Sequence, residues 1–320
     1  AMDEFTLIEK YFKKLTYKNP SALDLNDDVF FDKKNNVVIS IDTYVEGAHF
    51  INFRNPDLVI KKVIRSSISD LYCKGVKPKF IFIGASGNSN SFSNKNLNII
   101  SKSLKEEQKK YDIKLSGGDT TKSKKTIFTI MSLGYSKRIV QRNKCKNGDD
   151  IYVTGNIGDS YLGLQILKRK VLLNKKEHNY FTKKYYLPEL PVKISTNLLN
   201  FANSSIDISD GLFGDLSKLI NKCELFYKVD LNKVPISSNL RNYLNKSKKK
   251  KINFISKGDD YQIIFTSPKS KRNYIQKFFK KMNQKVTLIG NITKDARNNE
   301  IIEGNKRLKH AYNEAYSHNF

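Results

Sequence analysis

Segments with the pattern of strands alternate with segments of helix length along this chain, and this alternation limits the folds that it can adopt. Three segments are short, apolar and rich in β-branched residues, which predicts strands: residues 37–45, 79–85 and 126–134. Three others have the length and end signals of helices: residues 3–15, 55–74 and 95–111. Such a mixture indicates packed α/β layers rather than an all-β fold.

A second unit begins near residue 140. It contains four more predicted strands, at residues 150–154, 205–209, 261–266 and 285–292. Its predicted helices span residues 159–170, 210–223 and 269–283. A length of 320 residues is also typical of two domains.

The net charge of +27 has two interpretations, a nucleic-acid-binding surface or a lysine-rich solvated surface. The lysines are dispersed, and the one dense run, Lys248–Lys251, has no aromatic residues within it to stack on bases. We favour the solvated surface. No apolar run has the length that crosses a membrane, and the first residues lack a signal core, so we expect a cytoplasmic protein. The three cysteines are widely separated, which argues against a zinc site.

Aspartates gather in six short windows, most of which contain or adjoin Gly, Ser or Thr. These windows are residues 26–28, 40–42, 69–70, 117–120, 207–211 and 258–261. Each window alone is typical of a turn or a helix cap. Together, at what we predict to be strand ends, they indicate carboxylates that meet in one cleft.

Clustered carboxylates repel one another, so a cation has to offset their charge. No lysine lies inside the six windows. Magnesium ions prefer oxygen ligands and are typically shared between carboxylates and substrate phosphates, which favours a site for several Mg²⁺ ions around a nucleotide. The chain contains no Walker A sequence, no protein-kinase motif set and no dinucleotide fingerprint, so an ATP site here needs another architecture.

Four segments carry a resemblance to a known family: SIDTYVEGAHF (40–50), LSGGDTT (115–121), GDDIYVTGNIGDS (148–160) and IDISDGLFGDL (206–216). With these four segments in this order, the chain resembles the thiamine-monophosphate kinases of the aminoimidazole-ribonucleotide-synthetase-like superfamily. The resemblance implies an α+β fold with an N-terminal α/β sandwich at residues 1–138 and a C-terminal α+β domain at residues 139–320. It also implies a homodimer in which two N-terminal domains share a β-barrel.

The resemblance further implies that ATP and Mg²⁺ are used to phosphorylate thiamine monophosphate by direct in-line transfer. The implied metal ligands are Asp28, Ser40, Ile41 (through its backbone), Asp42, Asp70, Asp119, Asp207 and Asp210. The implied nucleotide contacts are Gly118, Asp119, Arg142 and Ser209. The residues implied to face thiamine monophosphate are His49 and Asp259. The acceptor is already an ionised phosphate, so no strong general base is expected.

The chain departs from the family pattern at four positions. Asn26 replaces the usual Gly, Ser67 replaces Asn, and Asp259 replaces a longer Glu. The family's C-terminal aromatic residue corresponds to Tyr312 only if the spacing shifts by one residue. None of these changes removes an implied metal carboxylate.

Three alternatives stay open. One is another ATP-dependent synthetase of the superfamily, although the first 25 residues lack the cysteine and glycine of selenophosphate synthetases and the tail lacks the cysteine of the hydrogenase-maturation factor. A second is an inactive relative that only binds thiamine phosphates. A third, from a different class, is a basic nucleic-acid-binding protein without catalysis.

Overall fold

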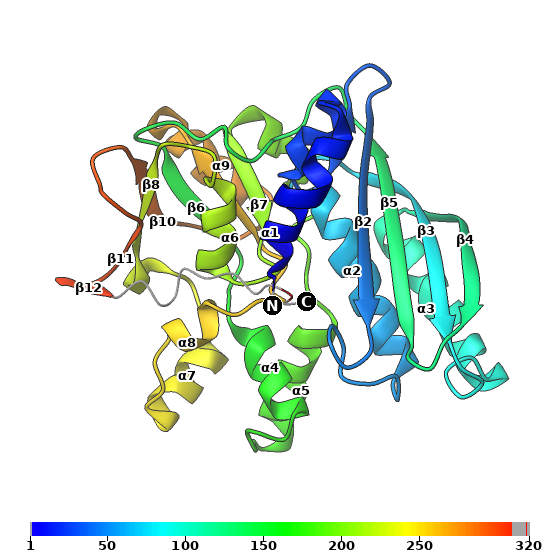
Figure 1. Cartoon of the computed structure of the whole chain (residues 1–320). Helices are drawn as coiled ribbons and strands as arrows, with labels where there is room; N and C mark the ends of the chain where they lie inside the picture. The colour runs from blue at the N-terminus through cyan, green and yellow to red at the C-terminus, as the bar shows by residue number, and fades with distance from the viewer. Residues whose placement is uncertain (1, 309–317, 319–320) are drawn as a thin grey trace.

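The computed structural model describes residues 2–308 and 318, which form two sheets with helices packed around them (Figure 1). The N-terminal sheet has the strand order β1-β2-β5-β3-β4. Its strands are β1 (Phe30–Asp32), β2 (Val37–Val45), β3 (Pro78–Gly87), β4 (Lys114–Lys122) and β5 (Ile127–Tyr135). Helices α2 (Pro56–Tyr72) and α3 (Asn94–Tyr111) pack on one face of this sheet.

Helix α2 is the central element of the N-terminal unit. Pro56 occupies its first turn, where a missing N–H costs nothing, and Gly75 follows its end with a left-handed φ of +80°. Most of its apolar side chains are buried, and Ile64 and Ile68 are fully so. Glu107 of α3 accepts two hydrogen bonds from the guanidinium of the buried Arg65, and this pair joins the two helices.

No element among the described residues covers the opposite face of the N-terminal sheet (Figure 1). Strand β2 alternates, with Val38 and Tyr44 buried toward α2 and Ile41 pointing outward with 66% of its surface exposed. The cross-strand register places Phe82 beside Met131 on the same outward face. Within one chain this sheet is therefore open, and the expected barrel would need a second sheet.

The C-terminal sheet has the strand order β12-β11-β8-β10-β6-β9-β7. Its strands are β6 (Asp150–Thr154), β7 (Ser204–Asp207), β8 (Phe226–Asp230), β9 (Ile263–Ser267), β10 (Val286–Thr293), β11 (Glu300–Glu303) and β12 (Lys306–Leu308). The accompanying helices are α4 (Asp159–Leu167), α5 (Lys175–Tyr186), α6 (Leu212–Leu219), α7 (Ser238–Ser247), α8 (Ile252–Ile255) and α9 (Arg272–Lys281). Short 3₁₀ turns are η3 (Pro20–Leu25), η4 (Ser195–Asn200), η5 (Leu231–Lys233) and η6 (Lys269–Lys271).

The first residues form three consecutive turns instead of the single helix predicted for residues 3–15. They are α1 (Glu4–Leu7), a π-helical turn η1 (Ile8–Phe12) and a 3₁₀ turn η2 (Lys13–Thr16). None of their residues is buried, so little packing supports a regular helix. In Figure 1 this segment lies between the two sheets.

The α+β fold class is confirmed, but the expectation that the acidic windows sit at strand ends is mostly wrong. Asp207 does end β7, whereas Asp42 lies inside β2 and Asp70 lies in the last turn of α2. Asp119 lies inside β4, a strand that the sequence pattern did not predict. Strand β4 is rich in glycine and exposed along its whole length, so it carries no apolar alternation.

Candidate active site

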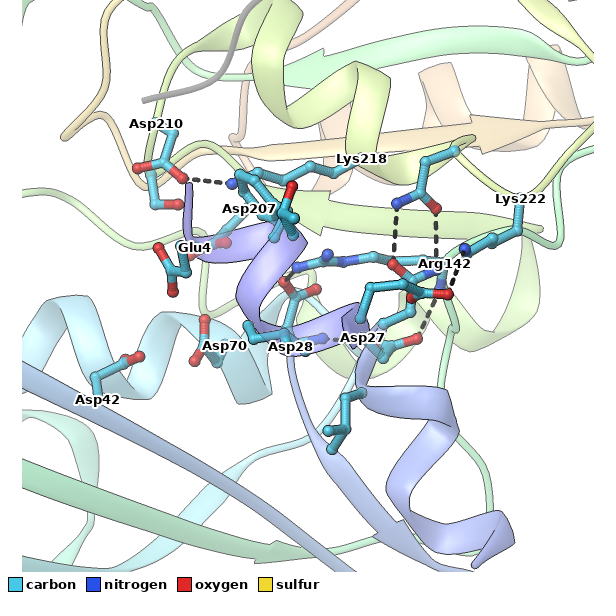
Figure 2. Close-up of a pocket in the computed structure, with 18 of the residues that line it drawn as sticks. Glu4, Asp27, Asp28, Asp42, Asp70, Arg142, Asp207, Asp210, Lys218 and Lys222 are labelled. Carbon is cyan, nitrogen blue, oxygen red and sulfur yellow. Dashed lines mark hydrogen bonds and ion pairs between the residues drawn. The ribbon is translucent and has the colours of Figure 1, made fainter. Parts of the chain in front are cut away.

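A cavity of about 820 Å³ lies between the N-terminal turns, the loop before β1, helix α2 and the C-terminal end of β7 (Figure 2). Its walls combine acidic and basic side chains. The acidic ones are Glu4, Glu9, Asp27, Asp28, Asp42, Asp70, Asp207 and Asp210. The basic ones are Lys10, Arg142, Lys218 and Lys222. Charged groups of both signs in one hollow are suited to binding a nucleotide together with metal ions.

Three carboxylates converge in this cavity. Oxygens of Asp28, Asp70 and Asp207 all lie within 4.8 Å of one another. They come from the loop before β1, from α2 and from β7, so only the folded chain brings them together. Two hydroxyl groups hold this arrangement, because Ser69 donates a 2.6 Å hydrogen bond to Asp207 and Ser40 donates to Asp70.

Asp42, Asp70 and Asp207 form no ion pair with any residue that the structure describes. Burial raises the pKa of Asp42 to about 6 and that of Asp207 to about 8. Burial and the neighbouring Asp42 and Asp207 raise the pKa of Asp70 well above its usual value. These carboxylates lack a counter-charge, and their hard oxygen donors fit Mg²⁺.

Asp28 differs from these three because protein cations compensate it. Burial alone would raise its pKa, but the charges of Arg142 and Lys74 lower it below the usual value. Lys74 Nζ lies 2.6 Å from Asp28 Oδ2, and Arg142 pairs with the other oxygen. The backbone N–H of Arg142 also donates to Asp27 at 2.9 Å. The Nε of Arg142 is buried without a hydrogen-bond partner among the described residues.

A second pairing lies at the start of α6. Lys218 pairs with Asp210 and lies 3.3 Å from Asp215 Oδ1. Sequence reasoning found no lysine within the acidic windows and missed both Lys74 and Lys218. The spacing of Asp215 and Lys218, three residues apart on a helix, is a signal that could have identified the second lysine.

The structure places most of the predicted metal and nucleotide residues in or beside one cavity. The cavity is lined by Asp28, Ile41, Asp42, Asp70, Arg142, Asp207, Ser209 and Asp210. Ser40 adjoins it through its hydrogen bond to Asp70. The other predicted residues, which do not line this cavity, are His49, Gly118, Asp119 and Asp259. Tyr312 lies outside the described residues.

Asp119 lies on the opposite face of the N-terminal sheet from Asp42. The register pairs Asp119 with Gly84, then Gly84 with Thr129, and Thr129 with Thr43, so all four share one face. Asp42 is the next residue before Thr43 and therefore points to the α2 side. Gly118 has a local structural role, since a Cβ there would lie 2.0 Å from the carbonyl oxygen of Ile83.

His49 and Asp259 lie on either side of a buried lysine. Lys62 Nζ is 2.8 Å from Asp259 Oδ1 and 3.9 Å from the centre of the Tyr185 ring. The Tyr185 hydroxyl donates to the carbonyl oxygen of His49 at 3.2 Å. This connection through Lys62 and Tyr185 was not predicted from the sequence.

The ring of His49 has a defined tautomer. The backbone N–H of Val45 donates to His49 Nδ1 at 3.0 Å, so the proton of the neutral ring lies on Nε2. Burial, followed by the nearby His318, lowers the pKa of His49. A neutral imidazole with Nε2–H outward is a hydrogen-bond donor, which suits recognition of an anionic group better than proton abstraction.

The loop that carries Asp259 runs directly beside the loop that carries Asp210. A Cβ on Gly258 would lie 1.8 Å from the carbonyl oxygen of Ser209, so only glycine allows this approach. The N–H of Asp259 donates to the same oxygen at 2.9 Å. Two windows that are far apart in the sequence are thereby held as one structural unit.

Comparisons with known proteins identify the family of this chain. Residues 25–135 match the family described as AIR synthase related protein, N-terminal domain. A thiamine-monophosphate kinase of Buchnera aphidicola subsp. Schizaphis graminum is 34% identical over 319 residues, covering 96% of each chain. The chain belongs to the thiamine-monophosphate kinase family. This membership confirms the family that the four sequence segments predicted.

Solved structures of thiamine-monophosphate kinases share the whole fold. AaThiL complexed with AMPPCP and TMP has a TM-score of 0.85 and 25% sequence identity, and the match covers 99% of this chain and 97% of that one. The thiamine monophosphate kinase of Aquifex aeolicus has a TM-score of 0.82 at 25% identity, over 96% and 97% of the two chains. These two matches agree with the α+β fold class predicted from the resemblance. Among the described residues, no helix is long and apolar enough to cross a membrane.

Proposed function

We propose that this chain transfers the γ-phosphate of ATP to thiamine monophosphate in the cavity that holds Asp28, Asp70 and Asp207. The chain is a thiamine-monophosphate kinase by family, and the related AaThiL was solved with AMPPCP and TMP. The observation that carries the proposal is the convergence of these three carboxylates, within 4.8 Å of one another, beside Arg142. Phosphoryl transfer depends on positioning and charge neutralisation, which such a site supplies.

The carboxylates of Asp42, Asp70 and Asp207 are the proposed principal Mg²⁺ ligands. Bound Mg²⁺ would neutralise the charge that spreads over the β- and γ-phosphate oxygens. Asp210 and Asp28 are proposed as further ligands, although each already pairs with a protein cation. Ser40 keeps Asp70 in place through its hydrogen bond, and the exposed Ile41 offers its backbone to the same cavity.

Arg142 and Ser209 are the proposed contacts of the nucleotide phosphates. The guanidinium of Arg142 has five N–H donors, and its recorded side-chain contact, with Asp28, uses one terminal nitrogen. Its pairing with Asp28 fixes the side chain before a phosphate binds. Ser209 lies on the loop between β7 and α6, beside Asp210.

His49 and Asp259 are the proposed contacts of the acceptor. Nε2–H of a neutral His49 can donate to the acceptor phosphate, and no base is needed because that phosphate is already ionised. Asp259 is proposed to face the cationic thiamine, with its carboxylate held in place by Lys62. The backbone hydrogen bond between Asp259 and Ser209 would hold the acceptor site and the nucleotide site in a fixed relation. ATP and thiamine monophosphate would thereby be aligned for in-line transfer without a phosphoenzyme.

We also propose a homodimer in which a second copy covers the open face of the N-terminal sheet. Part of that face is apolar, because the exposed Ile41 lies beside Met131, which in turn lies beside Phe82. Asp119 points outward on this face, away from Asp42 of its own chain. A metal or nucleotide role for Gly118 and Asp119 therefore implies that they act in the site of the partner subunit.

The direct test is an assay of purified protein with ATP, Mg²⁺ and thiamine monophosphate, with thiamine diphosphate as the measured product. Asp42→Asn and Asp119→Asn should each abolish turnover while circular dichroism stays native. Near-native rates in the Asp42 variant would contradict the metal assignment.

Mixing the two inactive variants tests the shared site. If Asp119 acts in the partner's site, random heterodimers of Asp42→Asn and Asp119→Asn each contain one intact site, and roughly a quarter of the wild-type activity should return. If Asp119 acts in its own chain, every site stays defective and no activity returns. Sedimentation analysis of Ile41→Lys checks the dimer itself, since a charge on the covered face should yield monomers.

The alternative functions fit less well. Other superfamily members share the fold, as a hydrogenase maturation protein HypE with ATP does at a TM-score of 0.68 and 16% identity, but that likeness shows the fold alone. A nucleic-acid-binding protein would not need the carboxylate cluster, and a salt-sensitive gel shift without Mg²⁺ would favour it. Cytoplasmic location stays a prediction, which cell fractionation can check.

A further inference from the structure

A lysine that no sequence window contains lies behind the metal cluster. Lys74 follows the C-terminus of α2, and its side chain has 0% of its surface exposed. Its ammonium group lies 2.9 Å from Asp27 Oδ1 and 2.6 Å from Asp28 Oδ2. It also donates a 2.7 Å hydrogen bond to the carbonyl oxygen of Ser205 on β7. One buried cation thus connects α2, the loop before β1 and the C-terminal sheet.

The position of Lys74 divides the acidic cluster into a half whose negative charge is neutralised by protein cations and a half whose charge is not. Asp27 and Asp28, with 4% and 5% of their side chains exposed, share the charges of Lys74 and Arg142. Two carboxylates and two cations give this half no net charge. Asp70 and Asp207 adjoin Asp28, yet neither pairs with a cation among the residues that the structure describes.

Breaking a buried pair by removing one partner is costly, because the remaining charge stays desolvated. Without Lys74, the carboxylates of Asp27 and Asp28 would share Arg142 alone, next to the two uncompensated carboxylates. A divalent ion is the group that could then take over the missing charge, since Asp28 is within 4.8 Å of the other ligands.

We propose that Lys74 is a built-in cation that compensates Asp27 and Asp28 in place of a divalent ion and holds their loop in position before metal binds. This inference rests on the proposed function, in which the same cluster binds Mg²⁺. Lys74 is a positioning residue, because it acts on the metal site through Asp28. Its presence makes the folding of the loop independent of Mg²⁺ and keeps Asp42, Asp70 and Asp207 as the principal ligands of the ion, with Asp28 held ready as a further one.

The test compares the thermal unfolding of wild type and Lys74→Met in EDTA and in excess Mg²⁺. Methionine keeps most of the volume and removes the charge. We expect Lys74→Met to lose roughly 5–10 °C of Tm in EDTA and Mg²⁺ to restore at least about half of that loss. Wild type should change much less between the two conditions. The control is Lys77→Met, because Lys77 forms an exposed pair with Asp112 and its loss should not depend on Mg²⁺.

The double variant Asp27→Asn/Lys74→Met covers the case in which Lys74→Met fails to fold in EDTA. It removes one charge of each sign and leaves Asp28 with Arg142, so its metal-free Tm should lie above that of Lys74→Met. The inference would be overturned if neither Mg²⁺ nor the Asp27→Asn substitution reduced the Tm loss of Lys74→Met. It would also be overturned if Lys74→Met lost no Tm at all.

A calorimetric titration of wild type with Mg²⁺ in the presence of a non-hydrolysable ATP analogue separates this inference from the proposed function. Absence of Mg²⁺ binding there would remove the proposed metal site and this inference with it. Binding in wild type together with a Mg²⁺-insensitive Lys74→Met would overturn only the role of Lys74. Tighter Mg²⁺ binding in Lys74→Met than in wild type would support it.

Discussion

The hydroxyl of Ser69 on α2 donates a 2.6 Å hydrogen bond to the carboxylate of Asp207 at the end of β7. Both side chains are buried, and they belong to different units of the fold, Ser69 to the N-terminal unit and Asp207 to the C-terminal unit. The bond therefore fixes one carboxylate of the C-terminal unit against the helix that carries Asp70. The relative position of two proposed metal ligands depends on this contact between units.

Replacement of Ser69 by alanine should weaken both stability and metal binding. The free energy of unfolding should fall by about 1–2 kcal/mol, because a buried carboxylate loses its hydrogen bond. Urea unfolding and a Mg²⁺ titration measure the two effects. Ser123→Ala is the matched control, since the hydroxyl of the half-buried Ser123 donates to the carbonyl of the nearby Lys125 and not to a carboxylate. Equal results for both variants would contradict a special role for Ser69.

The stability of the metal-free protein should depend on pH through Asp207. Its pKa in the folded protein is raised to about 8, above that of the unfolded chain. A raised pKa gives stability that is fully present below the unfolded value and is lost as pH rises toward about 8. In EDTA, Asp207→Asn should therefore gain stability over wild type as pH increases.

Urea unfolding of both proteins in EDTA at several pH values measures that difference. Asparagine mimics the protonated acid at every pH, so the gap between the two curves should widen from acidic toward mildly alkaline conditions. Asp24→Asn, at an exposed position, serves as the control for the substitution itself. A constant gap for Asp207→Asn too would show that this carboxylate is not perturbed.

Lys62→Met should affect the acceptor more than the nucleotide. The ammonium group of Lys62 holds Asp259 at 2.8 Å, so its loss should free that carboxylate and raise the KM for thiamine monophosphate by roughly tenfold. The KM for ATP should stay within about twofold of wild type. Lys61→Met is the neighbouring control, because Lys61 pairs with Asp57 of α2 and Glu106 of α3 and not with Asp259. Parallel changes in both KM values would argue against an acceptor role.

Glu107→Leu should destabilise the N-terminal unit without changing the chemistry of the site. It leaves the buried guanidinium of Arg65 without its bidentate partner, which typically costs about 3–5 kcal/mol. Chemical unfolding should show this loss, while kcat per folded molecule stays near that of wild type. A stability change below about 1 kcal/mol would mean that the existing hydrogen bond from Arg65 to the carbonyl of Pro188, at 3.4 Å, and solvent are enough to compensate the guanidinium.

The sequence predicted the carboxylates of the site because their chemistry is local. A short window such as Ser209-Asp210-Gly211 reveals its acid and its turn without knowledge of the fold. The face on which Asp119 lies depends on the pairing of β3, β4 and β5, and exposed glycine-rich β4 gives no periodic signal. The sequence could therefore identify Asp119 as a candidate residue but could not predict the sheet face on which it lies.

The cations of the site were harder to predict for a different reason. With 58 lysines and arginines in the chain, no single lysine stands out by composition. Lys74 and Lys218 become special only because folding buries them beside carboxylates. The prediction of a single helix at residues 3–15 was wrong because burial, too, is decided only by folding. The apolar residues of this segment, such as Phe5 and Phe12, remain exposed.

The close approach of Gly258 to Ser209 has a consequence for how this enzyme can change. The two loops share backbone hydrogen bonds, among them those from Asp259 to Ser209 and from Tyr261 to Ile208, and Gly258 leaves no room for a side chain between them. An insertion or a bulkier residue in either loop would displace the other, so a new acceptor could be accommodated only by exchanging side chains around Asp259. Changes in acceptor preference during the evolution of this enzyme should therefore come from substitutions around Asp259, while the lengths of both loops stay constant.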